Sequence, residues 1–400
     1  MNFPEYILVA GGGRWARVYI SNLLAILPPT LNILVFSPSN QSGIMSWAKE
    51  NRFSSRLKAV GELPEWSRSE AGCSVLIIVN AAKDHLKLIE WAISNQIPVL
   101  CEKPITASPE KTLLVASLVQ THKHSFAAAH VFLFTEYLEN FRKCIGEGDG
   151  INEIEFSWCD ALEEKRYGES KKYDASLPIH FDCIPHIYSI LYYLTGEEQA
   201  SCNQIFFSEG GSELNANLFF GPIPCRVLMK RNAPERRRFI RVISANQTFT
   251  LDFTNEPGKI FINSNAVSTE NHWNHSLKPI GLLLSAFFAG LINRDKDDRL
   301  DIRIGLNAAI LTKEIDVFYQ DEFKKWFFNN SDLSGKNRAM EYFLNETILR
   351  YGGAKLVSSS ILIKTYQLLK NNCTNVNDFL SMDIQDCLQL SNLLNENQVD

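Results

Sequence analysis

The feature that most restricts the fold of this chain is a regular pattern in its first 130 residues, where short apolar runs alternate with longer amphipathic stretches. The runs are rich in β-branched and aliphatic residues, and the stretches between them have helical periodicity. Strands this apolar are buried on both faces, which is typical of a parallel sheet with helices on each side. The beginning of the chain is therefore predicted to be a doubly wound α/β domain. Its expected helices cover residues 14–27, 44–51, 85–95 and 109–122.

The pattern changes beyond about residue 150, where apolar runs follow one another with only short turns between them. Such spacing predicts an antiparallel sheet, and the helices expected around it make the region α+β. The domain prediction is 1–130 for the doubly wound domain, 131–325 for the α+β domain and 326–400 for a helical C-terminal extension. The expected helices beyond residue 150 cover 185–194, 281–292, 302–318, 337–350 and 358–370.

Charge and cysteine usage restrict the partners and the compartment. The 40 Lys and Arg residues are balanced by 45 Asp and Glu, and no long block of like charge is present, so a nucleic-acid partner is not expected. The nine cysteines form no CxxC pair, and no leader-like segment opens the sequence, which favours free thiols in the cytoplasm. No apolar run reaches the length of a membrane span, so we expect no membrane association.

A glycine-rich turn follows the first predicted strand. Gly11, Gly13 and Ala16 have GxGxxA spacing, with Arg14 and Trp15 inside the motif. The first position permits a tight turn, the second lets the backbone approach a pyrophosphate, and the third lets helix and strand pack closely. Because the motif heads a βαβ unit, it predicts a dinucleotide site at the helix N-terminus, although such glycines also occur in ordinary tight turns.

The end of the second predicted strand bears on the choice of cofactor. An acidic residue there accepts hydrogen bonds from the ribose of NAD, but this chain has Ser37. With no carboxylate to repel a 2′-phosphate, and with Ser37, Ser39 and Arg14 as donors, NADP is favoured over NAD.

Two segments contain residues suited to acid–base chemistry. Glu102 and Lys103 follow a strand at the carboxyl edge of the predicted sheet, where a Lys ammonium can donate to a substrate oxygen. Asp182 and His186 are four residues apart, so a helix would turn both to one face and an imidazole could exchange the proton of an alcohol. The alternative for this second pair is a capping Asp and a core His. No metal-ligand spacing accompanies these residues, so no metal is expected.

Together these segments resemble the glucose–fructose oxidoreductase, inositol dehydrogenase and rhizopine catabolism family, written Gfo/Idh/MocA. The resemblance covers roughly residues 5–320, through AGGGRWA, through IIVNAAKDHLKLIEWAISNQIPVLCEKPI and through HFDCIPHIYSILYYLTG. It implies a Rossmann domain joined to an α+β domain with an open, mostly antiparallel sheet, and commonly a homo-oligomer.

The resemblance also implies roles for individual residues. Lys103 would contact substrate and cofactor, His186 would be the acid/base, and Asp182 would position the substrate. Asn80 and His85 would line the nicotinamide side, with Glu102 beside Lys103 in the cofactor pocket. The implied activity is hydride transfer between NAD(P) and a secondary alcohol or ketone of a sugar, cyclitol or related small polar molecule.

The chain departs from the family pattern at three positions, which leaves alternatives open. Ser37 replaces an acidic residue, Ala16 a third glycine, and Ser189 a second Asp found in many sugar dehydrogenases. The last change puts the usual polyol-binding pattern in doubt and keeps open an NADPH-dependent reductase of an imine or another C=N or C=C bond. A third alternative is a non-catalytic dinucleotide-binding protein that uses its C-terminal extension to bind a partner.

Overall fold

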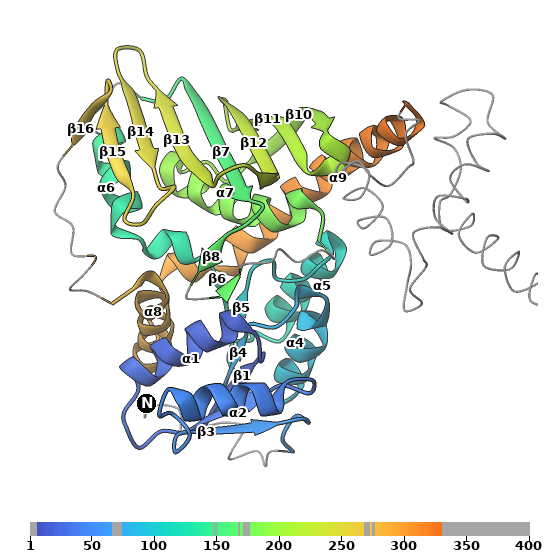
Figure 1. Cartoon of the computed structure of the whole chain (residues 1–400), viewed down its shortest axis with the longest axis vertical. Coiled ribbons are helices and arrows are strands. Elements are labelled where there is room, and N and C mark those ends of the chain that lie inside the picture. The colour runs from blue at the N-terminus through green and yellow to red at the C-terminus, as the bar shows by residue number, and fades with distance from the viewer. Residues whose placement is uncertain are drawn as a thin grey trace, which may run out of the picture. The chain divides into compact units, whose positions relative to one another are not determined.

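The computed structural model describes residues 6–65, 74–146, 148, 150–166, 169–170, 177–267, 273 and 277–329 (Figure 1). The helices predicted at 337–350 and 358–370, and nearly all of the predicted extension 326–400, lie outside these residues. No helix in the described part of the chain is both long enough and apolar enough to span a membrane.

The first sheet has six strands in the order β3-β2-β1-β4-β5-β6, and every neighbouring pair is parallel. This order confirms the predicted doubly wound domain and places its topological switch point between β1 and β4. The sequence prediction missed β3, a short edge strand with an exposed lysine in its second position. The strands are β1 (Tyr6–Ala10), β2 (Ile33–Phe36), β3 (Leu57–Val60), β4 (Ser74–Ile78), β5 (Val99–Glu102) and β6 (Phe126–Ala129).

Helices cover this sheet, and their apolar stripes explain its core. Alternate residues of β1 and β4, such as Leu8 and Leu76, pack with buried residues of α4 such as Ile89. Another helix, α5, begins at a serine cap, because the Ser108 side chain accepts from the Lys111 N–H and Pro109 occupies the first turn. The helices are α1 (Arg14–Ile26), α2 (Gln41–Glu50), α4 (His85–Ser94) and α5 (Pro109–Thr121), each close to its predicted range.

The second sheet has eight strands in the order β10-β11-β12-β7-β13-β14-β15-β16. It is mostly antiparallel, as predicted, but β7 and β12 pair in parallel. Buried and less buried residues alternate along β11 and β12, as expected for a sheet with one open face. The strands are β7 (Glu153–Ala161), β10 (Ala200–Ser208), β11 (Glu213–Phe220), β12 (Ile223–Ala233), β13 (Arg237–Ile243), β14 (Thr248–Asp252), β15 (Lys259–Ile262) and β16 (Asn265–Val267), and β8 (Lys165–Arg166) pairs separately with β9 (Glu169–Ser170).

Two later helices are longer than the sequence prediction. The predicted helix started at Pro185, but helix α7 begins at Ile179. This proline therefore lies inside the helix and does not start it. Helix α9 likewise runs past the predicted end at residue 318. The remaining helices are α6 (Glu136–Gly146), α7 (Ile179–Thr195), α8 (Pro279–Asn293) and α9 (Ile302–Asn329), and the 3₁₀ turns are η1 (Ala82–Asp84), η2 (Val131–Phe134), η3 (Glu209–Gly211) and η4 (Asp298–Leu300).

The chain forms two compact units that interleave along the sequence. Of the described residues, the first unit contains those up to 151 together with 184–199 and 242–310, and the second contains those in 152–183, 200–241 and 311–329. The predicted boundaries after residues 130 and 325 assumed continuous domains. The units differ from them because α8, far along the chain, packs against α1 and η2 of the first unit.

Candidate active site

The glycine turn lies at the switch point of the first sheet. Gly11 has a φ of +144°, and a Cβ there would lie 3.1 Å from the carbonyl carbon and oxygen of Val79, so only glycine fits. Gly13 caps α1 without contributing a side-chain hydrogen bond, and a Cβ on it would meet nothing within 4 Å. Ala16, in the first turn of α1, is fully buried. The turn thus has a close backbone approach at Gly11 and open space beside Gly13, where a phosphate would lie.

The loop after β2 packs against the same turn. A Cβ on Gly12 would clash with the Ser37 hydroxyl, and the Asn40 side-chain N–H donates to the Gly12 carbonyl at 2.7 Å. Ser37 is buried. Gly12 and Asn40 were not among the predicted site residues, although both adjoin predicted ones in the sequence.

Glu102, at the end of β5, is the centre of a buried hydrogen-bond cluster. Its Oε1 accepts from the Trp15 indole N–H at 2.8 Å and from the Tyr19 hydroxyl at 2.6 Å, and its Oε2 accepts from the Lys103 N–H at 3.0 Å. Burial raises the pKa of Glu102, and these hydrogen bonds oppose the shift. Burial and the nearby carboxylate raise the pKa of Tyr19 well above its ordinary value. Tyr19 was not predicted, but its position four residues after Trp15 on α1 provided a signal.

The turn that contains Lys103 is held by a buried histidine. The Lys103–Pro104 peptide bond is cis. His85 is 1% exposed, with Nδ1 3.1 Å from the Pro104 carbonyl oxygen and Nε2 3.1 Å from the Asn80 carbonyl oxygen. Burial lowers the pKa of His85. This ring, which the family resemblance assigned to the nicotinamide side, connects the turn after β5 to the residue that follows β4.

A second buried histidine, His130, follows β6 next to the Lys103 turn. The register pairs Glu102 with Ala129, so residues 103 and 130 leave neighbouring strands at the same edge. His130 is 1% exposed, and neither ring nitrogen has a hydrogen-bond partner. Burial, together with the positive charge of Lys103, lowers the pKa of His130 to about 3. His130 was not among the predicted site residues, although it follows a strand end of the sheet just as Lys103 does.

His186 lies against the segment that His130 begins. Its ring packs edge-to-face on Phe132 of η2, with centroids 5.1 Å apart. Ser189, which replaces the second Asp of many sugar dehydrogenases, is buried and donates its hydroxyl to the His186 carbonyl at 2.9 Å. Both His186 and Lys103 therefore border the 130–132 segment within the first compact unit.

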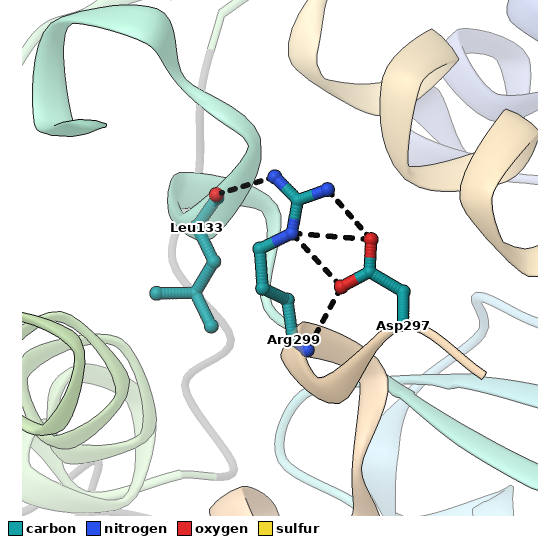
Figure 2. Close-up of polar contacts among 3 residues, drawn as sticks. All are labelled: Leu133, Asp297 and Arg299. Atoms are coloured by element: carbon teal, nitrogen blue, oxygen red, sulfur yellow. Dashed lines mark hydrogen bonds and ion pairs between the residues drawn. The ribbon is translucent and has the colours of Figure 1, made fainter. Parts of the chain in front are cut away.

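An arginine from a distant turn fixes this segment. Figure 2 shows the Arg299 guanidinium reaching the Leu133 carbonyl at 3.4 Å and pairing with Asp297, with Nη2 2.6 Å from Oδ2. The guanidinium also lies 4.1 Å from the centre of the Phe134 ring. Hydrogen bonding to Arg299 lowers the pKa of Asp297. His186 thus contacts Phe132 of η2, and Arg299 contacts Leu133 and Phe134 of the same turn.

Asp182 is held by a buried arginine of the second unit. Its Oδ2 accepts from Arg231 Nη2 at 3.3 Å, and Arg231 Nη1 donates to the Leu177 carbonyl at 2.8 Å. Arg231 is 2% exposed and lies near the C-terminal end of β12, where nothing local in the sequence marks it. The other histidine of this helix, His180, is fully buried and pairs with Asp316 at 2.9 Å, which is a structural contact.

The glycine-turn residues fit a dinucleotide. Arg14 Nη1, a donor, and Asn80 Oδ1, an acceptor, are buried atoms without a hydrogen-bond partner. They follow β1 and β4, the two strands of the switch point, where phosphate and amide groups of a ligand would satisfy them. Among the described residues, no group of three or more His, Cys, Asp and Glu side chains could hold a metal ion.

Comparison with known proteins identifies similar NAD-binding Rossmann domains. The family model described as an oxidoreductase family with an NAD-binding Rossmann fold matches residues 6–130. A myo-inositol dehydrogenase of Streptomyces leeuwenhoekii is 26% identical over 116 residues, which are 29% of this chain and 33% of that protein. The match thus spans about a third of the relative's length.

Solved structures share the fold over most of the chain. A UDP-N-acetylglucosamine 3-dehydrogenase from Acidithiobacillus ferrooxidans superimposes with a TM-score of 0.61 at 16% identity, covering 80% of this chain and 98% of that one. A myo-inositol dehydrogenase from Lactobacillus casei, in complex with NAD(H) and myo-inositol, gives 0.61 at 14% identity, covering 80% and 95%. Residues 6–130 of this chain are thus similar to the Rossmann domain of the Gfo/Idh/MocA oxidoreductase family.

Proposed function

We propose that this chain is an NAD(P)-dependent oxidoreductase that transfers a hydride between nicotinamide C4 and a secondary alcohol or ketone of a sugar, cyclitol or related small polar metabolite. The observation that carries the proposal is the grouping of the glycine turn, Lys103 and His186 in one compact unit. The relatives named above act on inositol and on a nucleotide-linked sugar, which supports this substrate class.

The chemistry assigned to the side chains follows from their types and positions. When bound, the nicotinamide supplies or accepts the hydride. The Lys103 ammonium donates a hydrogen bond to the substrate oxygen and stabilises negative charge there. The His186 imidazole accepts the hydroxyl proton during oxidation and returns it during reduction. In this proposal Asp182 positions the substrate, and Arg231 orients its carboxylate through a hydrogen bond.

The cofactor residues in this proposal are those of the glycine turn and its surroundings. Gly11, Gly13 and Ala16 shape the turn, while Arg14 and Trp15 begin α1 beside the phosphates. Ser37 follows β2 and Asn80 follows β4. His85 contacts the Asn80 carbonyl, and Glu102 accepts a hydrogen bond from Trp15. The absence of a carboxylate at Ser37 and the presence of Arg14 favour NADP over NAD.

Titration with NADPH and NADH, followed by nicotinamide fluorescence, tests the cofactor proposal. We expect tighter binding of NADPH, because a 2′-phosphate meets no carboxylate at Ser37 and finds a cation in Arg14. Equal affinities would remove the preference for NADP. Binding of neither nucleotide would overturn the proposed function.

Replacing Gly13 by alanine tests the position of the phosphates. The methyl group meets no protein atom within 4 Å, so the melting temperature should stay unchanged. It occupies the space where the backbone approaches a phosphate, so we expect the Kd for NADPH to rise about tenfold or more. The matched variant is Gly11→Ala, which should lower the melting temperature because its φ is +144°. A Gly13→Ala variant with unchanged Kd would place the phosphates elsewhere.

A reductase acting on an imine or another C=N or C=C bond is the second candidate. Ser189 favours it, because its hydroxyl is engaged by the helix backbone and supplies no second carboxylate for a polyol. A substrate screen distinguishes the two activities by whether sugars and cyclitols or conjugated imines consume or generate NADPH.

We also propose that the protein is a homo-oligomer. Two aromatic side chains of the second sheet, Phe206 on β10 and Phe219 on β11, are exposed at 53% and 39%. Exposed aromatic residues on one sheet are typical of protein interfaces. Light scattering of the purified protein should show a mass above the 45.4 kDa of one chain, and a monomer would contradict the proposal.

A further inference from the structure

His130 is a buried polar group that the proposed chemistry does not use. Burial of an imidazole without hydrogen bonds is unfavourable, because each unsatisfied nitrogen loses its hydrogen bond to water. Both nitrogens of His130 are in this situation, and the ring lies at the edge of the sheet where the site is formed. A group that supplies a partner to this ring would therefore stabilise the site.

The surroundings of His130 limit what that partner can be. Since the ring is 1% exposed, it does not line open space for a ligand. A Cβ on Gly305 would lie 3.6 Å from His130 Nε2, so α9 passes close to the ring and helps to exclude water. Lys103 leaves the neighbouring strand at the same level, and its charge acts on His130.

The His130 ring can accept a hydrogen bond, and it stays neutral while the Lys103 ammonium keeps its proton. The low pKa of His130 keeps the imidazole neutral near neutral pH, so one nitrogen is an acceptor and no second positive charge faces the ammonium. The nearby Glu102 carboxylate already accepts from Trp15, Tyr19 and the Lys103 backbone. An ammonium has three N–H donors, so it can serve His130 and a substrate oxygen together.

We propose that His130 is a positioning residue, whose neutral imidazole accepts a hydrogen bond from the Lys103 ammonium in the working enzyme and directs the other ammonium N–H groups toward the substrate oxygen. This inference rests on the function proposed above for Lys103. The observation behind it is the placement of an unpartnered, buried imidazole beside the lysine that the reaction needs.

The first test measures the contact and does not need turnover. The protein is labelled with ¹⁵N-histidine, and the ring nitrogen signals of His130, assigned with a His130→Gln variant, are compared between wild type and Lys103→Met with and without NADPH. Loss of the ammonium should shift the signal of the accepting nitrogen in at least one of the two states. Identical His130 signals in both proteins, with and without NADPH, would overturn the proposal.

The second test measures the effect on the reaction. His130→Leu replaces the imidazole by an apolar side chain of similar size, and we expect kcat to fall about tenfold, the effect of one hydrogen bond. The KM and the Kd for NADPH should change little, and the melting temperature should not fall, because leucine leaves no buried ring nitrogen without a partner. His130→Asn or His130→Gln, which restore an acceptor, should recover part of kcat. A His130→Leu variant with wild-type kcat would overturn the proposal.

The two tests separate this inference from the proposed function. If the wild-type protein binds NADPH but turns over no alcohol, ketone or imine, the proposed function fails, and the ¹⁵N spectra still decide whether His130 and Lys103 are paired. If the wild type is active and the spectra show no pairing, the reaction stands and this inference fails.

Discussion

Replacing Lys103 by methionine is expected to lower kcat by about 10²–10⁴-fold while changing the Kd for NADPH only a few-fold. Methionine keeps much of the side-chain length but removes the ammonium, so the substrate oxygen loses its charged donor as negative charge develops on it. An interaction made mainly in the transition state affects kcat far more than ground-state binding. The measurement is steady-state turnover on a substrate found by the NADPH screen, alongside the fluorescence titration.

The matched control for this variant is Lys111→Met, on the exposed face of α5. It changes the net charge by the same amount at a position away from the sheet edge, so its kcat should equal that of the wild type. The proposed mechanism is wrong if Lys103→Met retains wild-type turnover, or if both lysine variants lose activity equally.

Replacing Glu102 by alanine is expected to lower the free energy of unfolding by about 2–5 kcal/mol. The substitution leaves the fully buried Tyr19 hydroxyl and the Trp15 indole N–H without their acceptor, and each buried unsatisfied donor costs roughly 1–3 kcal/mol. It also leaves a cavity beside Tyr19. Urea denaturation followed by tryptophan fluorescence measures the change.

The companion variant is Glu102→Gln, which keeps an oxygen that accepts from Trp15 and Tyr19 but has no charge. Its loss of stability should be clearly smaller than that of Glu102→Ala, because an acceptor remains. If the two variants are equally destabilised, the carboxylate charge and not the acceptor matters. If Glu102→Ala has the same urea midpoint of unfolding as the wild type, the hydrogen-bond cluster contributes nothing to stability.

Most of the first domain could be predicted from the sequence, because its signals are local. The apolar runs and helical periodicities that define β1, β4 and α1 lie within single windows of the chain, and the structure has all three elements near their predicted bounds. The GxGxxA spacing is equally local, and the structure shows the tight approach at Gly11 and the open space at Gly13 that it implies. The edge strand β3 was missed because a short, half-exposed strand has little local signal.

Several of the candidate-site contacts could not be predicted, because they depend on residues far apart in the sequence. Arg231 reaches Asp182 across 49 positions. Arg299 reaches the Leu133 carbonyl across 166 positions. No periodicity or spacing in a single sequence encodes which strand lies next to which helix, so neither pairing had a signal. The interleaving of the two compact units has the same origin, because α8 joins the first unit only through packing against α1 and η2.

The sequence by itself determined the doubly wound fold, the dinucleotide turn and the identity of Lys103, Asp182 and His186 as candidates for chemistry, because strand ends, glycine spacing and helical spacing are properties of neighbouring residues. Only the tertiary structure decided that Glu102 is held by Trp15 and Tyr19, and that a buried His130 lies beside Lys103. Burial and hydrogen-bond partners arise when distant segments pack together, and they set the charge state and orientation of each group.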